Sequence, residues 1–230
     1  MLADRRLAGT AAVTAQPGRD ATTQPPRVTS VDVSAQLRDY QRAAVEAIVA
    51  GLAAGGRGQV VAACGTGKTL IGAAAAQRLC PTGLVVVTCP TLALTGQTME
   101  VWARTGVSDM LAVCSDNDIG DPAALVWGVA VPVTTDPQVV CDWIRCTPAS
   151  RQRLIAVTHV SAGRVGDGLA AADAVADLLI IDEAHHTAGR ADKHAALVHQ
   201  DQCLPARRRL YLTATPRIVT TRRPRSAAIR

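Results

Sequence analysis

The 230-residue chain is 48% hydrophobic and 19% charged, which suits a globular α/β domain and excludes an intrinsically disordered protein. At about 100–200 residues per domain, this length holds one domain with tails. No apolar run reaches the roughly 18 residues of a membrane helix, so we expect a cytoplasmic protein without membrane contact. The formal net charge is +5, but eight arginines and no acidic residue follow Asp201, which leaves the rest of the chain negative.

Strand-like and helix-like segments alternate along most of the chain. Residues 1–34 lack periodicity, and we expect a flexible leader there that is not a secretory signal. For residues 35–217 the pattern predicts an α/β domain with a mostly parallel, doubly wound sheet in three layers. We expect residues 218–230 to be a basic C-terminal tail. The expected helices are 38–53, 68–79, 91–104, 137–145 and 163–175, and the expected strands are 59–63, 84–88, 111–114, 126–133, 153–158, 177–182 and 208–213.

The sequence AACGTGKT at residues 62–69 lies between the first expected strand and an alanine-rich helix. Strand, glycine loop and helix together make a phosphate-binding loop, because small glycines let backbone N–H groups surround phosphates at a helix N-terminus. The ε-amino group of Lys68 can reach the β- and γ-phosphates of ATP, and the hydroxyl of Thr69 can bind Mg²⁺. The general pattern has glycine where Ala62 stands. The expected ATP-binding residues here are Cys64, Gly65, Thr66, Gly67, Lys68 and Thr69.

A second motif, Asp182-Glu183-Ala184-His185-His186, follows the apolar run at 176–181. In open α/β sheets, ligands bind outside the carboxyl ends of the strands. Two adjacent carboxylates there are costly unless they face a cation or carry out chemistry. Asp182 is therefore expected to hold Mg²⁺, directly or through water, and Glu183 to orient and deprotonate the attacking water. A solvated acidic turn is the alternative.

A third motif, Thr213-Ala214-Thr215, ends the last expected strand, and Pro216 follows it. With the three motifs in this order, the chain resembles the superfamily 2 helicases of the DEAD/DEAH-box group. It is most similar to the type III restriction enzyme and related helicase-like ATPases. The resemblance covers roughly residues 36–217 and implies a P-loop NTPase domain of the RecA-like type, with Mg-dependent ATP hydrolysis. It also implies a role for His185 in coupling the nucleotide state to the third motif, with Thr213 and Thr215 as the coupling residues of that motif.

The resemblance assigns roles to three further residues. The segment LRDYQ at 37–41 is similar to the family's entry segment, whose glutamine contacts adenine, which implies this role for Gln41. Thr91 and Thr158 follow expected strands and are similar to residues that contact a nucleic-acid backbone, with DNA favoured over RNA. Few aromatic rings are available to stack on bases, which also favours backbone contact. The alternatives are helix caps for Gln41 and Thr91, and an ordinary loop hydroxyl for Thr158.

Only fifteen residues follow Thr215, so we expect a second RecA-like domain, with the arginines that stabilise the transferred phosphoryl group, to be missing or on another chain. Two hypotheses stay open. The chain is the ATP-hydrolysing first domain of a helicase or translocase, slow or inactive alone, or it is a nucleotide-gated nucleic-acid-binding module without useful turnover. Glu183→Gln separates them, since only the first loses hydrolysis.

The arginines beyond Asp201 also allow two interpretations. Arg207, Arg208, Arg209 and those that follow are either a basic arm attracted to nucleic acid or a solvated chain end. The seven cysteines include no C-x-x-C pair and predict neither a disulfide framework nor a zinc site. Most are expected to be buried thiols, with Cys64 in the phosphate loop as the exception.

Overall fold

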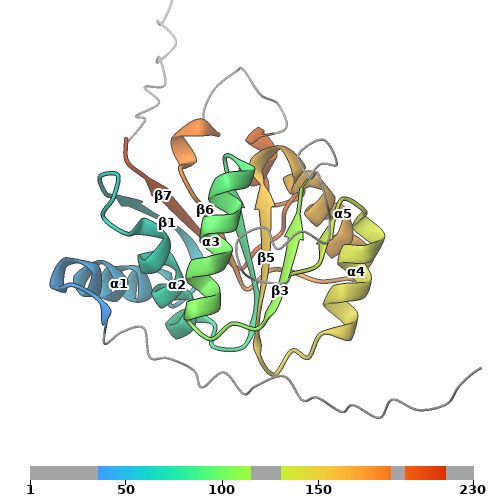
Figure 1. Cartoon of the computed structure of the whole chain (residues 1–230), viewed down its shortest axis with the longest axis horizontal. Coiled ribbons are helices and arrows are strands. Elements are labelled where there is room, and N and C mark those ends of the chain that lie inside the picture. The colour runs from blue at the N-terminus through green and yellow to red at the C-terminus, as the bar shows by residue number, and fades with distance from the viewer. Residues whose placement is uncertain (1–35, 115–130, 188–194, 216–230) are drawn as a thin grey trace, which may run out of the picture.

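Seven strands, all parallel, form one twisted sheet in the order β1-β7-β6-β2-β5-β3-β4 (Figure 1). The structure is a computed structural model and describes residues 36–114, 131–187 and 195–215. The strands are β1 (Gly56–Val61), β2 (Gly83–Cys89), β3 (Asp109–Val113), β4 (Val133–Thr134), β5 (Gln152–Thr158), β6 (Leu178–Ile181) and β7 (Arg208–Thr213). The helices are α1 (Asp39–Leu52), α2 (Lys68–Leu79), α3 (Leu92–Arg104), α4 (Pro137–Cys146) and α5 (Ala162–Ala171).

Successive strand residues alternate between two hydrophobic clusters, one on each face of the sheet. In β2, Val85 and Val87 belong to the cluster that α1, α2 and α3 cover, whereas Val86 belongs to the cluster that α4 and α5 cover. Both faces are therefore buried, which explains the continuous aliphatic runs of the strands. The three-layer α/β fold predicted from the sequence is confirmed.

The alanine-rich helix α2 packs closely on the centre of the sheet because its facing side chains are small. Ala73, Ala74, Ala75 and Ala76 are at most 1% exposed. A Cβ added at Gly72 would lie 3.3 Å from the side chain of Leu212 in β7 and 3.5 Å from that of Ile180 in β6, so little space is left between the helix and these strands. The close packing fixes the helix that follows the phosphate loop.

The observed boundaries agree with the predicted ones for most elements, and α2 and β7 match at both ends. Two predictions need correction. The first strand starts at Gly56 rather than Gln59, because its pairing with β7 extends back to Arg208. Helix α5 ends at Ala171 rather than at Val175. Shortly after this end, Asp173 takes a left-handed conformation with φ of 52°. The leader (1–34), the tail (218–230) and most of the strand expected at 126–133 lie outside the described residues.

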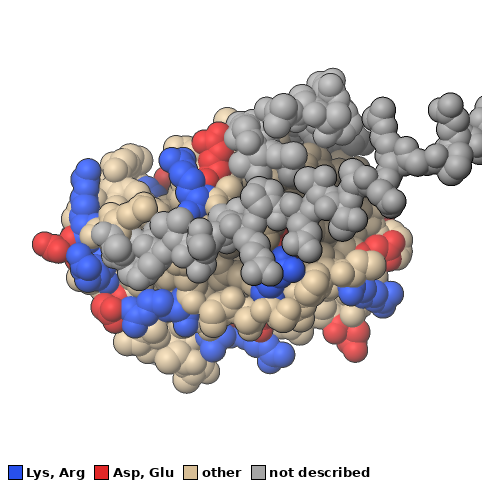
Figure 2. Space-filling model, turned by 60° about the horizontal axis from the view of Figure 1, so that its bottom comes forward, with Lys and Arg blue, Asp and Glu red and all other residues tan. Residues whose placement is uncertain are grey.

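The arginines at 207–209 do not form a basic arm. Arg207 precedes β7, and Arg208 and Arg209 begin it, at the amino-terminal edge of the sheet. Arg207 pairs with Asp177, and Arg208 donates to the carbonyl of Leu52. Figure 2 looks toward this edge, and the visible Lys and Arg side chains are interspersed with Asp and Glu. Arg209 is 1% exposed and donates to Asp201 and to the carbonyls of Val198, Gln200 and Leu204. It therefore holds the turn at 198–204 against the sheet.

The cysteine thiols differ in how far they are buried. Four of the seven cysteines are buried, Cys203 is half-buried, and Cys64 and Cys146 are exposed. Burial raises the pKa of the Cys80 and Cys89 thiols to about 12, so these two stay protonated.

Within the described ranges, no helix is both long and apolar enough to cross a bilayer.

Arg209→Ala should destabilise the domain far more than Arg207→Ala. Removing Arg209 leaves buried carbonyls without a donor, at about 1–3 kcal/mol for each unsatisfied group, so the loss should exceed about 2 kcal/mol. Arg207 makes an exposed ion pair, and its removal should change the free energy of unfolding by less than about 1 kcal/mol. Urea denaturation of both variants measures the difference. Equal losses would show that Arg209 does not hold the turn.

Candidate nucleotide-binding site

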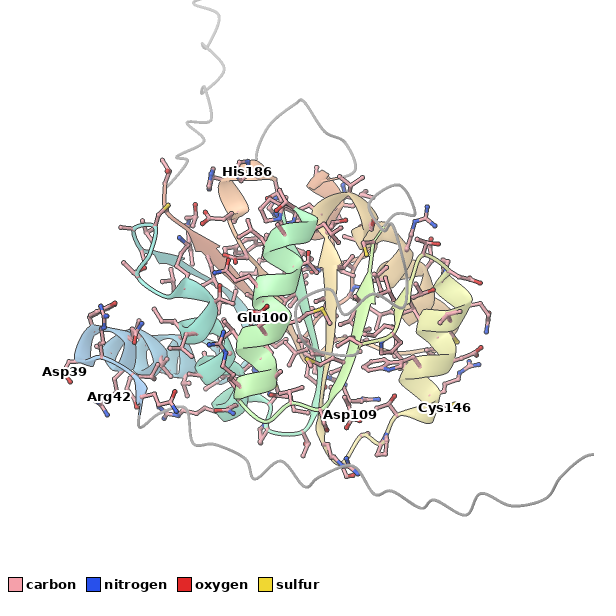
Figure 3. The ribbon with its side chains drawn as sticks, in the orientation of Figure 1. Asp39, Arg42, Glu100, Asp109, Cys146 and His186 are labelled. Atoms are coloured by element: carbon pink, nitrogen blue, oxygen red, sulfur yellow. The ribbon has the colours of Figure 1, made fainter. Side chains whose placement is uncertain are left out.

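The candidate site lies at the carboxyl ends of neighbouring strands. β1 leads into the loop at 62–67, β6 into Asp182 and Glu183, and β7 into Thr213, and these strands are adjacent in the sheet. Figure 3 marks this edge with His186, while Asp109 and Cys146 lie at the opposite edge. The position is the one where ligands bind in open α/β folds.

Two glycines shape the phosphate loop. Gly65 and Gly67 have φ of 77° and 79°, a left-handed conformation that glycine adopts without strain. A Cβ at Gly67 would lie 2.6 Å from Nε2 of Gln41, so a larger residue there would displace the end of the Gln41 side chain. The hydroxyl of Thr66 donates to the carbonyl of Ala63 at 2.7 Å and tightens the turn. Cys64 is exposed on the same loop.

Helix α2 starts at Lys68, and no side chain of the described residues caps its N-terminus. The first N–H groups of an α-helix have no partner within the helix, and together with the helix dipole they favour an anion. The loop and the uncapped helix therefore present the donors that a triphosphate needs. Binding of ATP by this loop stays a prediction.

Lys68 brings the first two motifs together. Its Nζ lies 3.0 Å from Oε1 of Glu183 and 3.4 Å from the carbonyl of Ala62, and the side chain is only 7% exposed. Residues far apart in the sequence thus meet in a place with little water, where ionic interactions are strong. This contact is what the sequence motifs predict if they serve one ligand.

Asp182 lies beside Thr69, the other residue predicted to bind Mg²⁺. The hydroxyl of Thr69 lies close enough to the Asp182 carboxylate to favour its charged form. Oδ1 of Asp182 also accepts the N–H of Glu183 at 2.9 Å. Burial, and to a smaller extent the charge of Glu183, raise the pKa of Asp182, and the hydrogen bonds and Lys68 only partly oppose this. A buried carboxylate beside a hydroxyl is a donor set that fits Mg²⁺.

Glu183 has a conformation that is unusual for a residue with a side chain. Its φ of 46° and ψ of 48° are left-handed, which costs about 1 kcal/mol or more. Oε1 faces Lys68, whereas Oε2 lies 3.2 Å from Nδ1 of His185 without a hydrogen bond of good geometry among the described residues. A buried oxygen of this kind can accept a hydrogen bond from a water molecule, as a general base must.

The third motif joins this network through His185. Nδ1 of His185 lies 3.3 Å from the hydroxyl of Thr213, and this hydroxyl in turn accepts the N–H of Thr215 at 3.2 Å. Lys68, Glu183, His185 and Thr213 therefore form a continuous chain of contacts. One histidine ring thus connects the carboxylate of Glu183 to the end of β7, and the coupling role of His185, Thr213 and Thr215 stays a prediction.

Gln41 contacts the phosphate loop itself. Its Nε2 donates to the carbonyl of Thr66 at 2.9 Å, and its Oε1 accepts the N–H of Arg38 at 2.9 Å and caps α1. The capping alternative is thus observed, and the adenine contact stays a prediction. Tyr40, which the sequence analysis did not select, donates its hydroxyl to the same carbonyl at 3.1 Å and is 46% exposed. The sequence signal for Tyr40 is its position directly before Gln41.

Thr91 and Thr158 lie at the same edge of the sheet, after or at the ends of β2 and β5. Thr91 caps α3 by accepting the N–H of Leu94 at 3.3 Å, and Thr158 is buried. Their contact with nucleic acid stays a prediction. Sequence analysis missed the next residue, His159, which is 3% exposed and lies 3.0 Å from the hydroxyl of Thr88 through Nδ1. Burial lowers the pKa of His159 to about 4, so its ring is neutral at pH 7.

Comparison with known proteins identifies the family. The family model described as type III restriction enzyme, res subunit, matches residues 34–218. The chain belongs to this family. Its described residues form the first RecA-like domain of the superfamily 2 helicase type, as the sequence motifs predict.

The chain is similar to parts of much longer proteins. It is 42% identical over 86 residues to DNA 3'-5' helicase XPB of Mycobacterium tuberculosis (strain ATCC 25618 / H37Rv), which covers 37% of this chain and 14% of the relative. Type ISP restriction-modification enzyme LlaGI, solved as a nuclease-deletion mutant with a DNA substrate mimic, has 26% identity and a TM-score of 0.66 over 79% of this chain and 18% of that one. DNA-bound LlaBIII has 27% identity and a TM-score of 0.64, with 78% and 12% covered.

Asp182→Asn should stabilise the folded domain at pH 7 in the absence of nucleotide. The raised pKa means that the folded state holds the Asp182 proton more tightly than the unfolded chain does. The contribution of Asp182 to the free energy of unfolding is therefore fully present below the pKa that this carboxyl has in the unfolded chain. It is lost as the pH rises through the pKa that the carboxyl has in the folded domain. Asparagine does not ionise, so the variant does not undergo this loss.

Urea denaturation at pH 7 and at lower pH measures this effect. The advantage of Asp182→Asn should be present at pH 7 and should shrink as the pH falls through the pKa of Asp182. A variant less stable than the wild type at pH 7 would show that Lys68 and Thr69 more than offset the burial of this carboxylate.

Proposed function

We propose that this domain binds Mg·ATP and hydrolyses it, coupled to the binding of DNA, within a superfamily 2 helicase or translocase. The observation that carries the proposal is the convergence of Lys68 and Thr69 with Asp182 and Glu183 at one edge of the sheet. Family membership supports the ATPase assignment, since the residues matched by the family model include all four.

The residues take separate roles in this reaction. The loop N–H groups and Lys68 bind the β- and γ-phosphates, while Thr69 and Asp182 hold the metal. Bound Mg²⁺ supplies positive charge against the charge that develops on the phosphoryl oxygens. Glu183 orients a water molecule and accepts its proton at the buried Oε2, beside His185.

The ion pair between Lys68 and Glu183 has to rearrange when ATP binds. In this structure the ammonium group of Lys68 faces Glu183 at 3.0 Å, although its proposed partner is a phosphate. Moving Lys68 toward the phosphates removes a cation from Oε1 of Glu183, and a carboxylate without that cation is a stronger base. The same displacement thus binds ATP and activates Glu183.

Nucleic acid would lie across Thr91 and Thr158, at the ends of β2 and β5 next to the nucleotide site. DNA is favoured over RNA because XPB, LlaGI and LlaBIII are described as a DNA helicase or as DNA-bound enzymes. We further propose that a second RecA-like domain, on another chain or elsewhere in a longer protein, completes the cleft with arginines, and that the protein acts in the cytoplasm. Residues 35–217 are the proposed ATP-binding domain.

Glu183→Gln should abolish hydrolysis while preserving or tightening Mg·ATP binding. The amide cannot accept the proton, so turnover should fall about 10²–10⁴-fold, the usual contribution of a general base. Losing the charge also frees Lys68 for the phosphates. Calorimetry with ATP and a phosphate-release assay measure the two effects.

Two matched variants serve as controls. Glu46→Gln makes the same change in an exposed ion pair with Arg78 and should alter neither property. Lys68→Ala should lose ATP binding itself. If Glu183→Gln leaves a measurable turnover unchanged, the chain is instead a nucleotide-gated nucleic-acid-binding module.

The 230-residue chain alone should hydrolyse ATP slowly. An arginine supplied by a second domain contributes about 10³–10⁵ in rate in related phosphoryl-transfer enzymes. Phosphate release with and without duplex DNA measures the basal rate, and adding a second RecA-like domain should raise it. Rapid DNA-stimulated turnover by this chain alone would contradict the need for that domain.

A further inference from the structure

We infer that His159 is a positioning residue that links the nucleic-acid-binding turns to Asp182, an inference that rests on the proposed function. Strands β6, β2 and β5 are adjacent, and their carboxyl ends carry Asp182, the turn to Thr91, and Thr158 with His159. The metal-binding strand thus lies beside the first of the two strands whose ends would contact DNA.

Thr88 joins the three strand ends. In the register of the sheet, Thr88 lies opposite Ile181 of β6 and Val157 of β5. Its carbonyl accepts the N–H of Asp182 at 2.9 Å, and its hydroxyl lies 3.0 Å from Nδ1 of His159. The backbone of Asp182 is therefore two hydrogen bonds from the residue that follows Thr158.

The hydrogen bond between Thr88 and His159 is buried. Thr88 is 0% exposed and His159 is 3% exposed, so water cannot easily replace the bond between them. Nε2 of His159 is also buried, and among the described residues it has no hydrogen-bond partner of good geometry. Burial lowers the pKa of His159, and the backbone of Asp182, which lies close to the ring, partly opposes this. A buried nitrogen without a well-formed hydrogen bond is costly, and an apolar side chain would fill the same space without that cost.

The position of the His159 ring connects the turn at Thr158 to Asp182. His159 starts the short helix η4 (His159–Ser161), so a movement of the turn at Thr158 moves the ring directly. The ring transmits the movement to Thr88, and Thr88 transmits it to the N–H of Asp182. DNA at Thr158 and the metal at Asp182 would therefore influence each other's affinity, as thermodynamic linkage requires.

The test measures the coupling ratio, defined as the dissociation constant for a labelled DNA duplex without Mg·AMP-PNP divided by that with it. Anisotropy titrations with the 230-residue chain give both constants. The wild type should show a ratio that differs from one by about 5-fold or more. His159→Leu should bring the ratio to about one, whereas His159→Asn, whose amide can still bond to Thr88, should restore most of it.

Two further variants separate positioning from stability. Thr88→Val removes the hydroxyl with little change of shape and should abolish coupling as His159→Leu does, with no further effect in the double variant. Val157→Ala creates a cavity in the same buried strand pair without touching the bond and should keep the wild-type ratio. If His159→Leu does not fold, Thr88→Val decides.

The outcomes distinguish this inference from the proposed function. A wild type that binds neither Mg·AMP-PNP nor DNA contradicts the proposed function. A wild type that binds both without mutual effect contradicts the inference alone. Retained coupling in Thr88→Val or His159→Leu, or equal loss in Val157→Ala, also overturns it.

Discussion

The ion pair between Lys68 and Glu183 is the contact on which the candidate site depends. Both side chains are largely removed from water, so neither charge is well solvated without the other. The pair can form only if β1 and β6 hold their loops at one edge, and the intervening β7 sets that spacing. The stacking order of three parallel strands thus determines whether the chemical groups meet.

The surroundings of this pair favour function over stability. Asp182 is buried close to Glu183, which raises its pKa, and Glu183 itself has a left-handed backbone. Such features are costly in a ligand-free protein and cluster at functional sites. A cation and a phosphate chain would relieve much of this cost by pairing with groups that now pair with one another.

Sequence reasoning placed correctly the residues whose positions depend on local spacing. Lys68 and Asp182 each follow an apolar strand within a short motif, so their position at the sheet edge could be predicted. Arg209 and His159 could not, because their roles come from contacts made only in the folded chain, with the turn at 198–204 and with Thr88. The start of β1 was missed since Gly56 and Gly58 are typical of a loop, and only pairing with β7 makes them a strand.

The pairing of β1 has a consequence for biosynthesis. Among the described strands, β1 bonds only to β7, the last one in the chain. During translation, the phosphate-loop strand therefore leaves the ribosome long before its partner does, and it must wait unpaired while the strands between them assemble. Closing so long a segment is entropically unfavourable and slow. Nascent chains that stop before residue 208 should hold an ordered centre of the sheet with an unformed phosphate loop.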